Sequence, residues 1–199
     1  MMRTFGWPEF LFILEAAKWT IALSAIAFAG GSIVGLMVAL ARTAESRVLQ
    51  FAATVFTQIF QGTPLLLQLF LVFFGAPILG LDINPWLAAA AALILNSGAF
   101  LGEIWRGCIQ AVPRGQLEAA QALSLSYYWR MRDVVLPQAM KIAVAPTVGY
   151  LVQIIKGTSL AAIIGFTEIT RAGQIINNAT FQPLVVFGVV AAIYFVLCW

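Results

Sequence analysis

The chain has 199 residues, of which 62% are hydrophobic and only 10% are charged, and its formal net charge is +3. Soluble domains carry about 25% charged residues, so this composition excludes a soluble globular protein and predicts a polytopic membrane protein. There is no histidine, and the two cysteines, Cys108 and Cys198, support neither a disulfide framework nor a histidine–cysteine metal site.

The first element in chain order is a long apolar segment with charges near its start. The run 10–14, flanked by Glu9 and Glu15, is too short to cross a bilayer, and we expect residues 1–18 to lie at the interface. The first span is expected at residues 20–41, long enough for about 30 Å of hydrocarbon. Its motif of small residues at 31–35 permits close packing, which we expect within the chain; a dimer contact is the alternative.

The second apolar region, residues 48–81, is too long for one straight span and contains an interruption. Pro64 removes a backbone hydrogen bond and its ring clashes with the preceding turn. An interrupted helix in a bilayer must be buried in protein or line a cavity. We therefore predict a broken second span over residues 49–75. Gln61 and Thr63 at the break are candidates for a transport route or for interhelical hydrogen bonds.

Three further helical spans are expected, so that the chain is an all-α protein with about five membrane helices. They cover residues 85–105, 139–164 and 183–199, with a polar link at 168–182 before the last. Asn96 lies inside the third span, where it can contact a route or hydrogen-bond another helix. Glu103 and Arg106, near the end of that span, are three residues apart, so that their charges can meet on one helix face.

Residues 106–138 are the longest charged interruption and are predicted to fold as helix–turn–helix. Pro113 suits a first helical position, and the residues from Gln116 to Leu123 favour helix. Ser126 can cap a second helix, which Pro137 is expected to stop. A connection of this kind predicts a docking surface for another protein; a linker lying on lipid head groups is the alternative.

Short motifs dispersed along the chain carry a family resemblance. Glu118-Ala119-Ala120, followed by the run LPQA at 136–139, resembles the "EAA loop" of permease subunits of ABC importers. The run VPRGQ at 112–116 and the run KGTSL at 156–160 are similar to the polar amino acid permeases, the family of the histidine, glutamine and arginine importers. The resemblance covers nearly the whole chain. It implies a single transmembrane domain over residues 1–199 that carries an amino acid across the membrane.

The resemblance also implies partners. A permease of this family works with two ATPase subunits, a second permease subunit that is identical or paralogous, and an extracytoplasmic substrate-binding protein. No phosphate-binding loop motif stands in this chain, so that ATP is expected on the ATPase subunits and this chain needs no cofactor. The residues expected to contact the ATPase are Arg114, Gly115, Gln116, Glu118, Ala119, Ala120 and Ser124. The family usually has glycine where Ser124 stands, so that its bend costs about 1 kcal/mol here.

Lys156 is a charge inside the fourth span, where charged side chains usually face a cavity and mark a pathway. Small and polar residues recur with it at steps of three or four, which predicts a stripe along the substrate route, with Lys156 holding a substrate carboxylate. A lysine that snorkels to the interface is the alternative. The route candidates are Gln61, Thr63, Asn96, Glu103, Gln153, Lys156, Thr158 and Ser159. The family often has an acid at Gly157 and an arginine at Gln61. If that acid contacts a positive group of the substrate, its loss disfavours a cationic amino acid; the substrate is then acidic or neutral, or this chain is the half of a paired permease without a full site.

The basic residues predict the orientation. They gather at 42–47 and 106–141, which places these two connections on the cytoplasmic side of the cell membrane. The N-terminus is then expected outside the cell and the C-terminus in the cytoplasm. Nucleic-acid binding would need a clustered basic face and is not expected. Without histidine, serine–histidine and cysteine–histidine catalytic pairs are impossible, so that we expect a transport subunit rather than an enzyme. A passive channel or a membrane scaffold is the rival interpretation.

Overall fold

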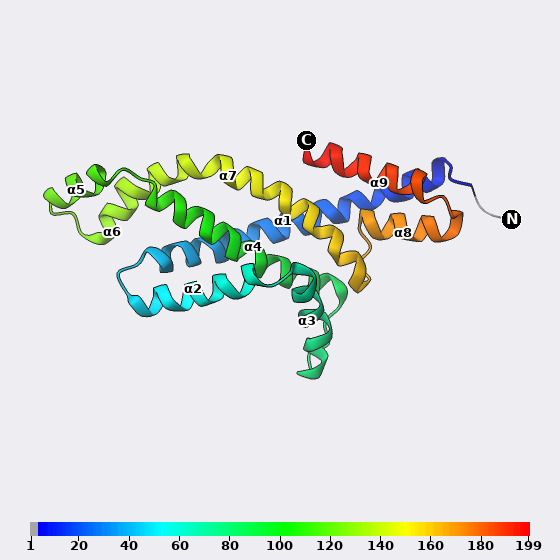
Figure 1. Ribbon diagram of the computed structural model, residues 1–199, viewed down its shortest axis with the longest axis horizontal. Coiled ribbons are helices and arrows are strands. Elements are labelled where there is room, and N and C mark those ends of the chain that lie inside the picture. Colours follow the sequence, from blue (N-terminus) through cyan, green and yellow to red (C-terminus); the bar gives the residue numbers. More distant parts are fainter. Residues whose placement is uncertain (1–3) are drawn as a thin grey trace.

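The computed structural model describes residues 4–199, and every regular element among them is a helix (Figure 1). The elements are α1 (Trp7–Thr43), α2 (Arg47–Gly62), α3 (Leu65–Ile78), α4 (Pro85–Gln110), α5 (Arg114–Ala122), α6 (Tyr127–Trp129), the π-helix η1 (Arg130–Val135), α7 (Leu136–Gly157), the 3-10 helix η2 (Thr158–Ile164), α8 (Ile169–Thr180) and α9 (Pro183–Cys198). The all-α architecture predicted from composition is confirmed.

Among residues 4–199, three helical stretches are long and apolar enough to cross a membrane: Trp7–Thr43, Pro85–Gln110 and Tyr127–Ile164. The pair α2 and α3, bent by 101° at its break, provides a fourth candidate span. The last apolar helix, α9, has 16 residues and is shorter than these candidate spans. The described residues thus contain three or four candidate spans, where the sequence predicted about five.

The first span predicted at residues 20–41 lies within a longer element, since α1 is one continuous helix of 37 residues that begins at Trp7. At 1.5 Å per residue such a helix is about 55 Å long, more than a bilayer core requires. No proline or glycine stands between Pro8 and Gly30. Nothing in the chain therefore ends the helix between the charged start and the apolar remainder.

The predicted break in the second span is confirmed at Gly62–Pro64. α2 ends at Gly62, and Pro64, in extended backbone conformation, stands immediately before the first residue of α3. Figure 1 shows α3 turned away from α2 and from the long axis of the molecule. Proline has no N–H to continue the helical hydrogen bonds, which is why the chain changes direction here.

Pro137 does not stop the preceding helix, contrary to the prediction. The residues just before it wind as the π-helix η1, and Pro137 falls in the first turn of α7, so that the rod continues from Tyr127 to Ile164. A proline ring normally presses on the turn before it. A π turn, whose hydrogen bonds reach five residues back, places one more residue in that turn and gives the ring room.

Glycines on α1 and α4 face each other and bring these two helices into close contact. A Cβ atom added at Gly31 would lie 2.6 Å from the Cβ of Ser97, and one added at Gly98 would lie 2.5 Å from a methyl group of Val34. Gly102 faces Val38 in the same way, at 2.6 Å. The small-residue motif of α1 therefore packs within the chain, as predicted, because side chains at these positions would hold the backbones apart.

The polar link predicted at 168–182 contains a helix, α8, which the prediction from sequence missed. Ile169, Ala172 and Gly173 are buried on one face of α8, and Ile169 and Ala172 pack with Ile13 of α1 and Val186 of α9. Figure 1 shows α8 and α9 beside the N-terminal half of α1, at the end of the molecule opposite α5 and α6. The long helix α1 thus connects the end formed by α8 and α9 with the end where α5 and α6 lie.

Candidate functional site

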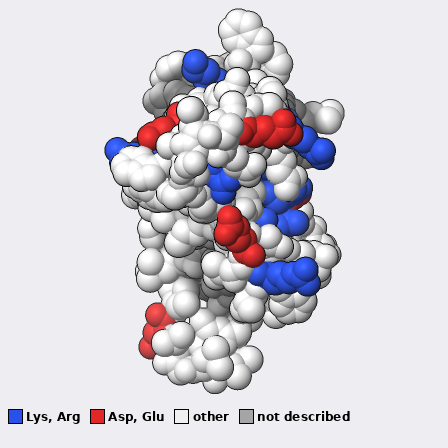
Figure 2. Space-filling model, turned by 90° about the vertical axis from the view of Figure 1, so that its left-hand side faces the viewer, with Lys and Arg blue, Asp and Glu red and all other residues white. Residues whose placement is uncertain are grey.

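The predicted docking segment lies at one end of the molecule, together with the turn between α1 and α2 (Figure 1). We call residues 114–130, from α5 to the start of η1, the coupling segment. Its predicted contact residues are mostly open to the surroundings: Arg114, Gly115, Gln116, Glu118, Ala119 and Ser124 are exposed. Figure 2 shows lysine, arginine and acidic side chains side by side at this end of the molecule. The segment therefore presents a mixed charged surface.

Ala120 differs from the other residues of this set. Its side chain is 3% exposed, so it packs under the exposed face of α5 instead of lying on it. Among the seven predicted contact residues, Ala120 is therefore the one whose side chain is not exposed. Pro113 is also placed differently from the prediction, because it precedes α5 as its N-cap while Arg114 is the first helical residue.

Ser124 adopts the left-handed backbone conformation, with φ of 56°. Its N–H donates to the carbonyl of Gln121 at 2.8 Å, and the N–H of Leu125 donates to the carbonyl of Ala120 at 3.2 Å. This double closure is the Schellman arrangement, in which glycine is the usual left-handed residue. The strained bend expected from the glycine-to-serine departure is therefore present.

A side chain at the start of α7 is connected to the first half of the segment. Gln116 on α5 accepts a long hydrogen bond of 3.5 Å from the amide of Gln138 on α7. The same amide of Gln138 donates to the carbonyl of Val134 at 2.8 Å. Gln138 of the LPQA motif thus contacts α5, the helix that bears the EAA motif.

At the helix break, polar side chains of α2, α3 and α4 form a network that we call the amide network. Gln68 donates to the carbonyls of Phe60 and Thr63, at 2.8 and 3.0 Å, and to the hydroxyl of Thr63 at 2.9 Å. Asn96 donates to the side-chain oxygen of Gln68 at 3.1 Å, and Gln61 donates to the carbonyl of Ala99 at 3.2 Å. The bonds from Gln68 satisfy carbonyls that the interruption leaves without helical partners.

The route candidates Gln61, Thr63 and Asn96 are therefore engaged inside the chain, by the interhelical and local hydrogen bonds that were the alternative to a route. Tyr150 extends the network to α7, since its hydroxyl donates to Asn96 at 3.5 Å. Tyr150 was missed as a member. Gln68, 5% exposed, is the buried amide near a helix break that the free carbonyls require.

The predicted stripe on α7 is exposed in this chain. Gln153 and Lys156 both point away from the core, and Ser159 is half-buried. Thr158 is fully buried and donates to the carbonyl of Ile155 at 2.7 Å, so its side chain is not on the stripe. Lys156 lines a cavity of about 320 Å³ between α7 and α9, together with Tyr194.

Gly157, where the family often has an acid, faces apolar side chains. A Cβ atom there would lie 3.3 Å from a methyl group of Leu65 and 3.7 Å from one of Leu93. A carboxylate in this space would lose hydration without gaining a partner from these leucines. The substitution by glycine therefore suits its surroundings.

Glu103 lies near the coupling end of α4 and is paired with two arginines. The predicted pair with Arg106 is confirmed, with Arg106 Nε donating to the carboxylate at 3.0 Å. Arg42 from the end of α1 binds the same carboxylate, a contact 61 residues away in sequence that the prediction missed. With both oxygens occupied, Glu103 braces α1 against α4.

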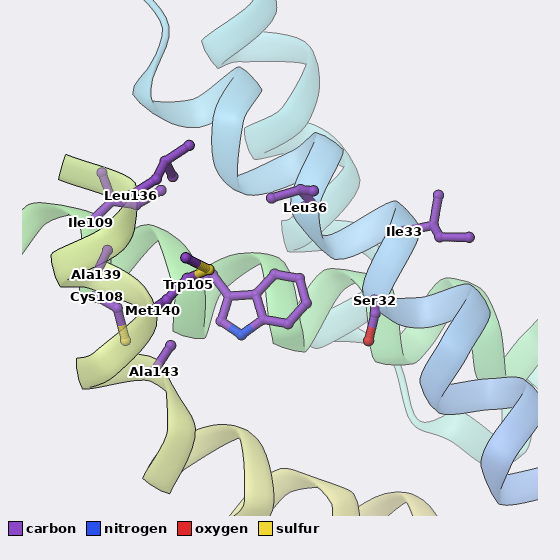
Figure 3. Close-up of a pocket in the computed structure, with 10 residues that line it drawn as sticks. All are labelled: Ser32, Ile33, Leu36, Trp105, Cys108, Ile109, Leu136, Ala139, Met140 and Ala143. Carbon is purple, nitrogen blue, oxygen red and sulfur yellow. The ribbon is translucent and has the colours of Figure 1, made fainter. Parts of the chain in front are cut away.

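A cavity of about 380 Å³ opens between α1, α4 and α7 (Figure 3). In Figure 3, Trp105 stands in the middle, with Leu36 on one side and Met140 on the other. The indole N–H of Trp105 donates to Thr147 at 2.8 Å. The lining is almost wholly apolar, so this cavity does not suit a polar substrate.

Glu168 is a further residue that the sequence pattern marked only as part of a polar link. It is fully buried and caps α8, accepting hydrogen bonds from the N–H groups of Thr170 and Arg171, both at 2.9 Å, and from the hydroxyl of Tyr194 at 2.6 Å. Burial raises the pKa of its carboxyl, although these three donors act in the opposite direction. The carboxyl fastens α8 to α9.

Comparisons with known proteins agree with this architecture. The model of the family described as "Binding-protein-dependent transport system inner membrane component" matches residues 31–199. The chain is 34% identical to the probable amino-acid ABC transporter permease protein YckA of Bacillus subtilis (strain 168), over 96% of this chain and 84% of that protein. It is 35% identical to the glutamine transport system permease protein GlnP of Escherichia coli (strain K12), over 96% and 88%.

Solved structures share the fold. A crystal structure described as an amino acid ABC transporter with histidines superposes with a TM-score of 0.89 at 33% identity, over 94% of this chain and 87% of that chain. The MetNI methionine ABC transporter in an inward-facing conformation superposes with a TM-score of 0.80 at 18% identity, over 98% and 93%. At that identity the second likeness supports the fold alone.

Proposed function

Because the chain belongs to the family of binding-protein-dependent transport system inner membrane components, we propose that it is the permease subunit of an ATP-driven importer of polar amino acids. The observation that carries the proposal is the exposed coupling segment between α4 and α7, whose helix α5 bears the EAA motif and contacts Gln138 of the LPQA motif. A short rigid segment fixed to two membrane helices converts a push from a partner into movement of both helices.

The partner at this segment is an ATPase subunit. Arg114, Gln116, Glu118 and Ala119 lie on the exposed face that meets it, while Gly115 leaves room for close approach and the bend at Ser124 sets the angle between the two short helices. Two ATPase subunits, each on one permease of an identical or paralogous pair, close on ATP and draw the coupling segments together. The route then opens to the outside, and hydrolysis resets it inward.

The orientation follows from the same assignment. The coupling segment, the turn after α1 and the paired Arg42 and Arg106 lie on the cytoplasmic side, where basic residues accumulate in membrane proteins. The N-terminus is then outside, on the side from which an extracytoplasmic binding protein delivers the amino acid.

The substrate route runs along the exposed face of α7. Gln153, Lys156 and Ser159 provide polar groups there, and Lys156 holds the substrate carboxylate. The relatives are named for amino acid transport, one of them for glutamine. Gly157 among apolar side chains offers no acid for a second positive charge, which favours a neutral or acidic amino acid over a cationic one.

The decisive experiment is co-purification of the ATPase with the permease. Glu118→Arg reverses an exposed charge on α5 and should abolish recovery of a nucleotide-binding partner, while Glu15→Arg, an exposed reversal at the other end of α1, should leave it unchanged. Equal recovery with both variants would refute docking at this segment. A passive channel, the rival interpretation, predicts uptake into vesicles without ATP.

The role of Lys156 is tested by uptake of radiolabelled glutamine into proteoliposomes that contain the assembled complex. Lys156→Met keeps most of the side-chain length but removes the charge, and it should abolish uptake while the complex stays assembled. Lys141→Met, also exposed on α7, is the matched control. Unchanged uptake by Lys156→Met would remove this residue from the route.

A further inference from the structure

The coupling segment contacts the end of α1 and the turn between α1 and α2, although its two flanking helices are α4 and α7. The hydroxyl of Tyr127 donates to the carbonyl of Thr43, the last residue of α1, at 3.2 Å. Arg130 forms an ion pair with Glu45, in the turn between α1 and α2, at 3.7 Å. In each pair the two residues are far apart in the sequence. Two separate contacts therefore join the second half of the segment to one short turn.

The turn that receives these contacts is itself well braced. Gln50 on α2 donates to the carbonyl of Ala44 at 2.7 Å, and the hydroxyl of Thr43 donates to the carbonyl of Ala39 at 2.9 Å. One residue before Thr43, Arg42 is paired with Glu103 on α4. A turn held on both sides moves as a unit with the ends of α1 and α2.

Arg130 is half-buried while Glu45 is exposed, so that Arg130 is the fixed side of the ion pair. Its side chain is 16% exposed, whereas the side chain of Glu45 is 76% exposed. The Nε atom of Arg130 is buried and has no hydrogen-bond acceptor among residues 4–199. The guanidinium thus has a donor in reserve, and a small movement of Glu45 can turn the single long ion pair into two parallel hydrogen bonds.

We propose that Thr43, Glu45, Tyr127 and Arg130 form a latch that carries movement of the coupling segment into α1 and α2. The proposal rests on the proposed function, since it presumes that an ATPase moves the segment. α4 and α7 follow the segment through the peptide chain, but α1 and α2 have no direct covalent connection to it. Through the latch, the same movement reaches the helix break at the far end of α2, where Gln61 and Thr63 lie.

In this account Tyr127 and Arg130 are positioning residues. They bind neither the substrate nor ATP, and their effect is on how many amino acid molecules are moved for each ATP hydrolysed. A purely structural brace would change the amount of folded complex but not that ratio in the complexes that assemble. The ratio of glutamine uptake to ATP hydrolysis is therefore the quantity to measure.

The test uses the assembled transporter, with its ATPase and binding protein, in proteoliposomes supplied with radiolabelled glutamine and ATP. Arg130→Glu places two like charges at the latch and should lower the uptake-to-hydrolysis ratio by about two- to fivefold, the scale of a surface ion pair. Arg132→Glu is the matched control, because Arg132 belongs to the same π-helix but pairs with Asp133 instead of the turn. It should leave the ratio unchanged.

Charge exchange decides whether the pair itself is responsible. Glu45→Arg alone should lower the ratio as Arg130→Glu does, and Glu45→Arg combined with Arg130→Glu should restore it. If Arg130→Glu does not assemble, Glu45→Arg carries the test from the exposed side, and Tyr127→Phe, which removes only the donor to Thr43, should give a smaller loss. An unchanged ratio in both single variants, or no recovery in the exchange, overturns the latch.

Failure of the latch can be told apart from failure of the proposed function by including Glu118→Arg in the same preparation. If that variant loses its ATPase while Arg130→Glu transports normally, the segment docks the ATPase and only the latch is wrong. If Glu118→Arg retains both its ATPase and its uptake, coupling through this segment is wrong, and the latch falls with it.

Discussion

The coupling segment and the amide network are both polar interruptions in an apolar chain, but their polar groups are satisfied in opposite ways. On α5, Arg114 and Glu118 are exposed. At the helix break, Gln68 and Asn96 are buried and hydrogen-bonded to their neighbours. Exposed charge on a short rigid helix suits contact with another protein, whereas a saturated buried network holds the membrane helices in place.

The comparison predicts different consequences of mutation. A change in the buried bundle should first cost stability, because it leaves strained contacts or unpaired polar groups. A change on the exposed face of the coupling segment should cost transport with little effect on stability. The largest loss of stability is therefore expected at the closest packing in the bundle, between α1 and α4.

Gly98→Ala should give the largest effect, a loss of about 3 kcal/mol in the free energy of unfolding, at the upper end for overpacking. The added methyl group would lie 2.5 Å from a side-chain carbon of Val34, so α1 and α4 must separate. Gly107→Ala on the same helix is the control, because nothing lies within 4 Å of its new Cβ atom. Unfolding of the purified subunit in mixed micelles by titration with dodecyl sulfate measures both, and equal stability of the two variants would contradict the α1–α4 packing.

Gln68→Leu should cost about 2 kcal/mol, since it removes the donor to the carbonyl of Thr63 and the acceptor of the buried Asn96 amide, and leaves the carbonyl of Phe60 only a long bond of 3.4 Å from Asn96. Gln58→Leu, on the exposed side of α2, should be close to neutral. The same unfolding titration provides the measurement. If Gln68→Leu changes the free energy of unfolding only slightly but abolishes uptake, the amide network has a role in transport and not only in stability.

The features that the sequence predicted well are those with a local cause. Pro64 has no N–H for the helical hydrogen bond, which is a local reason for the break, and the glycine spacing at 31 and 35 permits close packing by its own geometry. The coupling segment was recognisable because its charged, helix-favouring residues are too polar to cross a bilayer and too strongly helical to form a plain loop between the apolar spans. In each case the residues themselves supplied the physical reason.

The features that the sequence did not reveal depend on contacts between distant segments, or on local structure that relieves the clash of a proline ring. Arg42 binds Glu103 across 61 residues, and no spacing rule joins them. Pro137 carries a strong stop signal, yet the π turn before it absorbs the clash and the helix continues. α8 could have been found, since Glu168 is a side-chain cap and buried residues follow at helical spacing. The polar character of its other face concealed it.

Ser124→Gly should give the smallest effect, and it sharpens the comparison because the expected sign is a gain. Ser124 has a φ of 56°, which costs a residue with a Cβ atom about 1 kcal/mol, and glycine adopts this conformation without that strain. Part of the gain is lost because glycine is freer in the unfolded chain, so that a net stabilisation of about 0.5 kcal/mol is expected. Ser124→Ala keeps the strain and should show no gain. Since the side chain is exposed and the bend stays the same, uptake of glutamine by Ser124→Gly should equal that of the unmodified chain; a changed uptake would mean that the serine hydroxyl itself takes part in docking the ATPase.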